Sequence, residues 1–519
     1  MDSDKITEEK APVEEVPVEE VPVNPVVAVD PHDIIPEEIP NPEEAVTEEI
    51  VNPSDQLPDL RMKGKRVLVI GVVDERKDFI WKALRRLGVE LFAAGSRPKE
   101  QMKGFVKKYI TYDSSDHNLD EQICEEIAET VQKEIGNVDG CICFWDTETP
   151  LADLVAARLG KHTIPFTGVA IAMSKAKTLE ALILADENLS TAKYSSSCIA
   201  VECDADLVEY SDTVGFPAVM KTEYGAGAMG VKLVNSLEDA VDHFNHIQVL
   251  HEQFTDRAYK LGGTFKRSCV LMDYLRGSEH CVDLAIFHGE LVCAFVTDKG
   301  PQLPPDVFKT TVAMPSLLEE NDLEAVITAA FECCMALGLA HGVFDVDVML
   351  TSKGPKLIEI NPRVGGFCQR EFILQCYNVD LAQLSCMVAC DIKPHFASSE
   401  NEQVNGYNPK SAKHAVLPSC SHYVGMYCYP VRHGSALKST ATPEILRGLH
   451  DKQELLFIQH EMQLREHEHE LPFCTVAFKA DTFDKAQKHM IEMCSKLGLE
   501  TDDVSIKTLT DYFRPKKSA

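Results

Sequence analysis

The stretch from His341 to Gly366 reads HGVFDVDVMLTSKGPKLIEINPRVGG, and the fold of the chain depends on it. Two apolar runs, Val343–Leu350 and Leu357–Ile360, flank a Lys-Gly-Pro segment that favours a turn, so the stretch predicts a two-stranded hairpin. Both runs contain acidic residues. Because a carboxylate in a buried sheet costs free energy unless it is paired or bound to a metal, these residues need partners.

The acidic residues of this hairpin are spaced to share a face. Alternate residues of a strand point the same way, so Asp345 lies with Asp347, and Glu359 lies with Asn361. Two such faces, paired across the hairpin, offer the oxygen ligands that hard cations prefer. Arg363 follows on the same side. The alternative is a buried ion pair among Arg363, Glu359 and the aspartates, which is a common way to bury charge.

Length and charge exclude several classes of protein. A chain of 519 residues is too long for one ordinary domain and suggests about three, and an apolar content of 45% supports a real core. The 82 acidic and 51 basic residues give a formal net charge of −31, which argues against nucleic acid as the main partner. No apolar run reaches the roughly 18 residues that span a bilayer, so we expect no membrane segment.

The cysteines point to a reducing compartment. The 18 cysteines include no Cys-x-x-Cys pair and show no regular spacing. The sequence also shows no secretory signal at its start. These features predict reduced thiols in a cytoplasmic protein rather than a framework of disulfides.

Residues 1–60 differ in composition from the rest of the chain. They contain 18 acidic residues, two lysines and no arginine, so −16 of the net charge lies here. Ten prolines and the segment Val-Pro-Val-Glu-Glu-Val-Pro prevent regular structure. We expect a disordered, acidic, proline-rich tail that solubilises the protein, in preference to a specific binding arm.

Residues 61–170 alternate between strand and helix patterns. The expected strands are Arg66–Val73, Val89–Ala94 and Asp139–Trp145, and the expected helices are Lys77–Leu87 and Leu151–Leu159. Such alternation predicts a parallel α/β layer. A single glycine near the end of the first strand is not a GxGxxG fingerprint, so a structural layer is favoured over a separate dinucleotide site. Such a layer can still contribute substrate contacts at its strand ends.

A glycine-rich loop separates two short strands in the next part of the chain. After a helical pattern that opens with Lys175 and Lys177, Phe216–Lys221 and Val231–Val234 read as strands, and TEYGAGAMG lies between them. A dinucleotide site needs a helix after its loop, whereas here a strand follows. The sequence therefore predicts a glycine hairpin. Protein kinases share this arrangement, but the chain has no HRD or DFG segment.

The glycine hairpin is suited to a triphosphate. Gly225, Gly227 and Gly230 let backbone N–H groups approach phosphate oxygens with no Cβ in the way. Lys221, at the end of the preceding strand, can neutralise phosphate. A lone lysine at a strand end is usually a solvated charge, and the adjoining loop favours the binding role instead.

The segment Ser268–Phe287 predicts antiparallel strands joined by a polar turn, which Leu291–Val296 continues as a meander. One strand ends in Asp273-Tyr274-Leu275, and a Gly-Ser-Glu turn carries Glu279. Backbone groups near Leu275 and a carboxylate near the ribose would suit an adenosine at this turn.

Helices and a small α+β domain complete the chain. Helices are expected at Asn321–Leu339 and Phe372–Cys390, and residues 394–413 read as a polar loop. Further on, the expected strands are Tyr423–Val431 and Phe473–Phe478, and the expected helices are Pro443–His450 and Thr482–Leu497. The segment Glu466–Glu470 reads EHEHE and could bind a transition metal, but an exposed polar loop is favoured.

Three segments, MKTEYGAGAMGV, LMDYLRGSEH and LIEINPRVGG, occur in this order and resemble the ATP-grasp superfamily over residues 65–390. The resemblance implies two α+β subdomains that grip ATP between antiparallel sheets, behind an α/β pre-domain. The expected fold class is therefore α/β and α+β. The expected organisation is a tail at 1–60, an α/β pre-domain at 61–170, an ATP-grasp domain at 171–393 and a small carboxyl-terminal α+β domain at 394–519.

The resemblance also implies a role for each motif residue. The residues expected at the ATP phosphates are Lys177, Lys221, Gly225, Gly227 and Gly230. Those expected around the adenosine are Asp273, Leu275 and Glu279. Those expected to hold Mg²⁺, or Mn²⁺ in its place, are Asp347, Glu359 and Asn361, with Arg363 as the catalytic residue at the reacting phosphoryl group.

Further segments are similar to the carboxyl-terminal half of the carnosine synthase family, which joins β-alanine to histidine with ATP. They include AFVTDKGP, STATPEILRGLHD and LPFCTVAF. That family has an additional amino-terminal portion, and related metal sites commonly have glutamate at the position of Asp347. The resemblance implies an ATP-dependent carboxylate–amine ligase that works through an acyl phosphate on small amino acids. We expect small-molecule amino acids as its partners, with neither nucleic acid nor membrane among them, and allow for a homo-oligomer.

Two other classes stay open from the sequence. A biotin carboxylase-like enzyme has the same fold, although this chain carries no Met-Lys-Met biotinyl segment. A nucleotide-binding regulator without turnover is a class outside the enzymes, and the intact set of lysine, glutamate, asparagine and arginine argues against it. Amine-dependent release of ADP separates the ligase from both.

Overall fold

The computed structural model describes most of the chain after residue 58. The described ranges are 59–71, 77, 79–98, 102–113, 116–162, 166–185, 191–225, 227–228, 230–253, 267–302, 309–366, 368–396, 415–460, 471–500 and 505–514. Except for its last two residues, the expected acidic tail lies outside these ranges, and so does Glu466–Glu470. All 18 cysteines lie within them and are free thiols. No helix in these ranges is long and apolar enough to cross a membrane.

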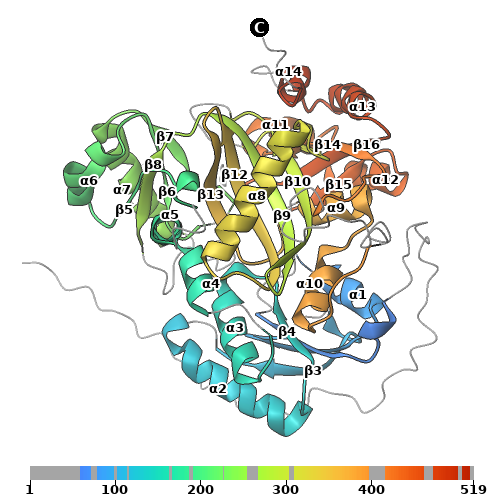
Figure 1. The fold of residues 1–519 in the computed structure, drawn as a ribbon. Helices are drawn as coiled ribbons and strands as arrows, with labels where there is room; N and C mark the ends of the chain where they lie inside the picture. Colours follow the sequence, from blue (N-terminus) through green and yellow to red (C-terminus); the bar gives the residue numbers. More distant parts are fainter. Residues whose placement is uncertain are drawn as a thin grey trace, which may run out of the picture. The chain divides into compact units, whose positions relative to one another are not determined.

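The first part of the described chain is a parallel sheet with helices packed on it (Figure 1). The strand order is β3-β2-β1-β4, and every pair is parallel. The strands are β1 (Arg66–Ile70), β2 (Glu90–Gly95), β3 (Val106–Thr111) and β4 (Gly140–Cys143), and the helices are α1 (Phe79–Arg86), α2 (Asp120–Thr130) and α3 (Thr149–Arg158). After Arg66, β1 is an unbroken apolar run because both of its faces are covered. The predicted parallel α/β layer is confirmed.

The glycine loop belongs to a small antiparallel sheet with the order β5-β8-β6-β7. Its elements are β5 (Cys198–Val201), α6 (Asp204–Tyr210), β6 (Ala218–Thr222), β7 (Lys232–Val234), α7 (Leu237–Gln253) and β8 (Cys269–Asp273). The pairing of β6 with β7 confirms the predicted glycine hairpin. Two helices, α4 (Phe166–Met173) and α5 (Lys175–Leu184), precede this sheet in the chain.

The opening stretch forms one edge of a large antiparallel sheet with the order β13-β12-β9-β10-β11-β14-β16-β15. The strands of its first half are β9 (Gly277–Phe287), β10 (Glu290–Lys299), β11 (Thr311–Met314), β12 (Gly342–Thr351) and β13 (Gly354–Asn361). The predicted hairpin is the β12–β13 pair. Helix α8 (Glu320–Ala336) packs across the face of β12 and β13 (Figure 1).

The carboxyl-terminal elements extend this same sheet. They are α9 (Gln369–Tyr377), α10 (Leu381–Ala389), β14 (His422–Cys428), α11 (Pro430–Leu437), α12 (Pro443–Asp451), β15 (Leu456–Gln459), β16 (Cys474–Ala480), α13 (Phe483–Lys496) and α14 (Ile506–Asp511). Because β11 pairs with β14, backbone hydrogen bonds join the expected ATP-grasp and carboxyl-terminal domains. The domain boundaries themselves stay a prediction.

One apolar core joins the α/β layer to the large sheet. Trp81 on α1, Phe295 on β10, Phe372 on α9 and Leu381 on α10 are all buried in it. The helices α9 and α10 therefore hold the two layers against each other. This packing fixes the end of β13, and with it Arg363, relative to β4.

The predicted meander over Ser268–Phe287 is wrong at its first turn. β8 pairs with β5 and β6 in the small sheet, whereas β9 pairs with β10 and β12 in the large one. The short segment Tyr274–Arg276 therefore crosses from one sheet to the other instead of closing a hairpin. Apolar alternation predicts each strand but not its sheet, and only the β9–β10 part of the meander is confirmed.

Two element boundaries also differ from the prediction. The expected helix over Phe372–Cys390 is two helices, because Asn378 adopts a left-handed conformation (φ 57°) that ends α9. The expected strand over Tyr423–Val431 stops at Cys428, because Pro430 begins α11 at a position where its missing N–H costs nothing.

Candidate active site

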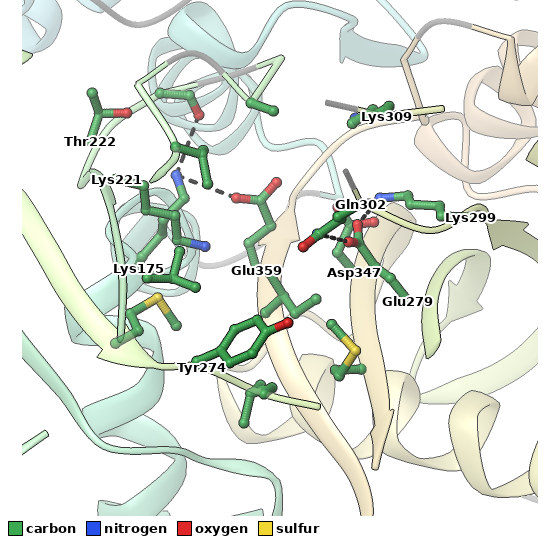
Figure 2. Close-up of a pocket in the computed structure, with 18 of the residues that line it drawn as sticks. Lys175, Lys221, Thr222, Tyr274, Glu279, Lys299, Gln302, Lys309, Asp347 and Glu359 are labelled. Carbon is green, nitrogen blue, oxygen red and sulfur yellow. Dashed lines mark hydrogen bonds and ion pairs between the residues drawn. The ribbon is translucent and has the colours of Figure 1, made fainter. Parts of the chain in front are cut away.

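A cavity lies between the glycine hairpin of the small sheet and the β12–β13 hairpin of the large sheet (Figure 2). Lys175 and Lys221 stand on one side of it, and Asp347 and Glu359 face them from the other. Cations on one wall and carboxylates on the other suit a polyphosphate that carries a divalent cation.

Lys175 connects the two walls. Its Nζ lies 3.3 Å from Glu359 Oε2 and donates to the carbonyl oxygens of Glu223 (3.3 Å) and Gly225 (3.4 Å). The lysine is only 8% exposed, so these partners rather than water stabilise its charge. Lys177 lies two residues further along α5, about 200° around the helix. It is exposed and lies outside the cavity lining, so its contact with the ATP phosphates stays a prediction.

Lys221 reaches the cavity from β6. Burial lowers the pKa of Lys221, because its ammonium group loses water, and the nearby Glu359 carboxylate opposes this effect. The side chain is 6% exposed. An anion in the cavity would favour the charged form of this lysine, which is the behaviour expected of a phosphate contact.

The glycine loop brings backbone rather than side chains to the cavity wall. Gly225 and Gly227 line the cavity, whereas Gly230 does not. A Cβ at Gly225 would lie 1.9 Å from Thr222 Oγ1, and Gly227 has a φ of 72°, so side chains are excluded at both positions. Gly230 anchors the far end of the loop, since its carbonyl accepts a hydrogen bond from His243 Nε2 (2.9 Å).

The register of the β12–β13 hairpin places its polar residues on one face. Asp345 pairs with Asn361, and Asp347 pairs with Glu359, so the predicted common face is confirmed. On the other side of β12, Cys281 of β9 pairs with Asp347, and its Sγ lies 2.7 Å from Asp345 Oδ1. The ligand atoms of Cys281, Asp345 and Asp347 lie within 4.8 Å of one another, close enough to hold a cation.

Lys299, at the end of β10, lies between two carboxylates of the cavity. Its Nζ is 2.7 Å from Asp347 Oδ2 and 2.8 Å from Glu279 Oε1, and Gln302 Nε2 donates to Glu279 Oε2 (3.0 Å). Burial by itself would raise the pKa of Glu279, but Lys299 holds it below its usual value. Burial raises the pKa of Asp347 to about 6, against the opposing charge of Lys299.

The residues present fit a magnesium ion. Among the described residues, Asp347 Oδ1 is buried without a hydrogen-bond partner. Such an oxygen is costly to bury, and a cation would supply the missing interaction. Glu359 shares the strand face, and carboxylate oxygens are the ligands that Mg²⁺ takes.

Arg363 and Asn361 lie beside this cavity rather than in its lining. Arg363 Nη1 is 3.0 Å from Asp345 Oδ2, and its Nε is 2.9 Å from Asp146 Oδ1, just after β4. Asn361 Nδ2 donates to Asp345 Oδ2 (3.4 Å). The buried ion pair left open by the sequence is thus present at Arg363. The arginine also lines a second cavity, beside β4 and α3.

The structure brings most of the predicted site residues together. Those that line the cavity are Lys221, Gly225, Gly227, Asp273, Leu275, Glu279, Asp347 and Glu359. Those that do not are Lys177, Gly230, Asn361 and Arg363. Lining residues without a predicted role include Lys175, Tyr274, Lys299, Gln302 and Lys309. Of these, Lys299 could have been recognised in the sequence, because it is the last residue of a largely apolar strand. Lys221 is similar, since it is the second-last residue of β6.

Residues 214–371 match the family model of the ATP-grasp domain. This range includes both hairpins that face the cavity. The fold is the ATP-grasp fold. An L-amino acid ligase from Bacillus licheniformis shares it with a TM-score of 0.62 and 16% identity, over 84% of this chain and 98% of that one. The biotin carboxylase domain of the Hydrogenobacter thermophilus 2-oxoglutarate carboxylase gives a TM-score of 0.56 and 13% identity, over 87% and 94%.

The ATP-grasp domain lies in a chain that resembles a carnosine synthase over most of its length. Carnosine synthase 1 of Homo sapiens is 33% identical over 458 residues, which are 87% of this chain and 53% of that protein. This chain therefore spans about half the length of that relative. The resemblance indicated by the sequence motifs is confirmed.

Proposed function

We propose that this chain is an ATP-dependent carboxylate–amine ligase that joins two amino acids through an acyl phosphate. The main support for this proposal is the cavity in which Lys175 and Lys221 face Asp347 and Glu359. It offers cations for a triphosphate and oxygen ligands for Mg²⁺, or Mn²⁺ in its place. The resemblance to carnosine synthase supports β-alanine and L-histidine, or related amino acids, as the substrates.

The proposed reaction has two steps. A carboxylate oxygen of the first amino acid attacks the γ-phosphorus of ATP, the bond to the ADP oxygen breaks, and an acyl phosphate forms. The amine of the second amino acid then attacks the acyl carbon, phosphate leaves, and the nitrogen loses a proton. Bound magnesium supplies charge neutralisation at the phosphate oxygens.

The residues of this chain bind and orient the reactants. Lys175, Lys221 and the backbone of the glycine loop hold the phosphates, and the crossing segment near Asp273 and Leu275 holds the adenosine. Arg363 serves the reacting phosphoryl group, because its planar group is already oriented by two aspartates. A filled cavity excludes water, which protects the acyl phosphate from hydrolysis.

A screen of amino-acid pairs tests the proposal. We expect Mg²⁺-dependent ADP release only when a carboxylate donor and an amine acceptor are both present, together with a product whose mass equals the two amino acids less one water. ADP release that requires bicarbonate and biotin would indicate the carboxylase instead. ATP binding with no ADP release under any pair would indicate the regulator.

Two further expectations stay proposals. A cytoplasmic location is tested by fractionation of cells that express the chain. A homo-oligomer is tested by light scattering on the purified protein, where a mass of 57.6 kDa would identify a monomer and contradict it.

A further inference from the structure

Three polar side chains from distant parts of the chain meet outside the ATP cavity. His162 follows α3 of the α/β layer, His288 lies in the turn between β9 and β10, and Asp391 follows α10. Each side chain is about half exposed, with 52%, 46% and 41% of its surface in solvent. One ligand atom of each lies within 4.8 Å of the other two.

Both histidines aim the same ring nitrogen at one carboxylate. His162 Nε2 lies 3.0 Å from Asp391 Oδ2, and His288 Nε2 lies 2.5 Å from Asp391 Oδ1. The two imidazole rings are in edge contact, with centroids 4.9 Å apart. A tetrahedral zinc ion with bonds near 2.1 Å spaces its ligand atoms by about 3.4 Å, so small side-chain movements would admit the ion.

The surrounding backbone holds this geometry in place. His288 and Asp391 both have left-handed backbone conformations, with φ of 49° and 58°. Side chains other than glycine rarely adopt that region. His341 supports the turn, because its Nδ1 accepts from the backbone N–H of His288 (3.4 Å) and its Nε2 donates to the Val388 carbonyl (2.9 Å). Both nitrogens of His341 are thereby engaged, which leaves it a positioning residue rather than a ligand.

The structure assigns His162, His288 and Asp391 as a binding site for a first-row transition metal, with Zn²⁺ as the favoured ion. Two imidazole nitrogens and one carboxylate are a ligand set that zinc accepts, with water in the fourth position. Mg²⁺ takes oxygen ligands, so this site differs in chemistry from the one proposed at Asp347 and Glu359.

The proposed metal would cross-link the fold. It joins the end of α3 in the α/β layer, the β9–β10 turn of the large sheet and the end of α10. His162 also lines the second cavity together with Arg363, so the metal would stand at the edge of that cavity. A ligand that binds the folded state stabilises it according to its concentration relative to Kd, so zinc should raise the melting temperature.

Direct metal binding tests the site without any assay of activity. The full chain is stripped with a chelator, and dialysis against Zn²⁺ is followed by elemental analysis. A parallel titration with Co²⁺ reports tetrahedral coordination by visible absorption. The variants are His162→Asn, His288→Asn and Asp391→Asn. The matched control is the double substitution His467→Ala and His469→Ala, which removes the other candidate segment recognised in the sequence.

We expect the wild-type chain and the control to bind one equivalent of zinc more than each site variant, and to show a zinc-dependent rise in melting temperature. Each single variant should weaken zinc binding by at least about tenfold and lose that rise. Circular dichroism identifies variants that fold, and any one folded variant of the three decides the question. Equal zinc binding by the wild type and a folded site variant would overturn the assignment and leave a hydrogen-bonded His–Asp–His cluster.

Discussion

At the scale of single residues, two lysines on helix α5 differ in their position relative to the cavity. Of the two, Lys175 lines the cavity, whereas Lys177 is exposed and lies outside the cavity lining. Lys175→Ala removes a cation that contacts Glu359 and the glycine loop, so we expect the ATP affinity to fall about tenfold or more, near 1.4 kcal/mol. Lys177→Ala should bind ATP like the wild type. Calorimetric Kd values for both variants check this, and an equal loss in the two would contradict the placement.

Lys221 differs from an ordinary phosphate-binding lysine because the folded protein holds it buried. Its pKa is lowered by burial, so the charge costs free energy when the cavity holds no anion. We expect Lys221→Ala to weaken ATP binding while leaving the melting temperature of the ligand-free protein unchanged or higher. A clear fall in that melting temperature, with ATP affinity retained, would make Lys221 a structural residue.

Glu359→Gln tests the metal site with almost no change in side-chain size. The substitution removes one charge from the carboxylate face and weakens the contact with Lys175. We expect metal-dependent ADP formation to fall by orders of magnitude, because a metal can supply several kcal/mol of transition-state stabilisation. Measuring kcat per folded molecule together with the melting temperature separates this from a structural ion pair. Normal turnover in a destabilised protein would remove the main support for the ligase.

At the scale of elements, strand alternation in the sequence located the hairpins but not their partners. The spacing of Asp345, Asp347, Glu359 and Asn361 predicts one shared face, and the register confirms it. The same reasoning could not place β8 and β9 in different sheets, because alternation reports which face is buried and not which strand lies alongside. Short elements such as β3 and β5 give no clear strand pattern in the sequence, because partly exposed residues interrupt their apolar alternation.

The residues of the candidate site also fall into two groups, those whose position follows from local sequence pattern and those whose position depends on tertiary packing. Residues fixed by strand period or by a glycine loop, such as Glu359 and Gly225, lie where the sequence predicts. Lys175 and Lys177 depend on the rotation of a helix about its axis, which an approximate motif spacing does not determine. Arg363 depends on the packing of a different layer, because its partner Asp146 is more than two hundred residues earlier in the chain.

The helix α11 carries a buried histidine that should make stability depend on pH. His433 Nδ1 accepts a hydrogen bond from the Tyr429 N–H (3.0 Å), and burial lowers the pKa of His433 to about 4. The unfolded chain takes up this proton near pH 6.5, whereas the folded protein resists it down to about pH 4. The free energy of unfolding should therefore decrease as pH falls through that window, by roughly 3 kcal/mol from this group.

His433→Asn is the matched test, because an amide oxygen can accept the same backbone hydrogen bond and does not titrate. We expect a flatter stability profile between pH 6.5 and 4 in urea unfolding experiments on the variant than on the wild type. If the free energy of unfolding falls with pH equally in the two proteins, His433 does not account for the loss of stability in acid.

At the scale of the whole molecule, the acidic charge is distributed very unevenly. Residues 1–60 contribute −16 of the net charge of −31 and contain ten prolines. We expect deletion of residues 1–58 to leave kcat and KM near their full-length values, because such a composition buries little apolar area. Steady-state kinetics of the truncated chain check this. A large fall in kcat with the fold intact would give the tail a role in catalysis.

Arg363 links the α/β layer to the large sheet through ion pairs. Its guanidinium bridges Asp146 and Asp345, and these two aspartates raise the pKa of Arg363 although burial opposes them. Asp146→Asn removes one of the two charges and should lower the free energy of unfolding by about 1–3 kcal/mol. Because the arginine keeps its contact with Asp345, kcat per folded molecule should be retained.

Arg363→Lys separates a structural bridge from a catalytic group. A lysine has no planar fork to contact two carboxylates or a phosphoryl group at two points, so we expect it to lower both stability and kcat per folded molecule. The comparison with Asp146→Asn is decisive because both variants weaken the same bridge, and only one changes the arginine. If urea unfolding shows a similar loss of stability in the two and both retain kcat, Arg363 holds the layers together and takes no part in phosphoryl transfer.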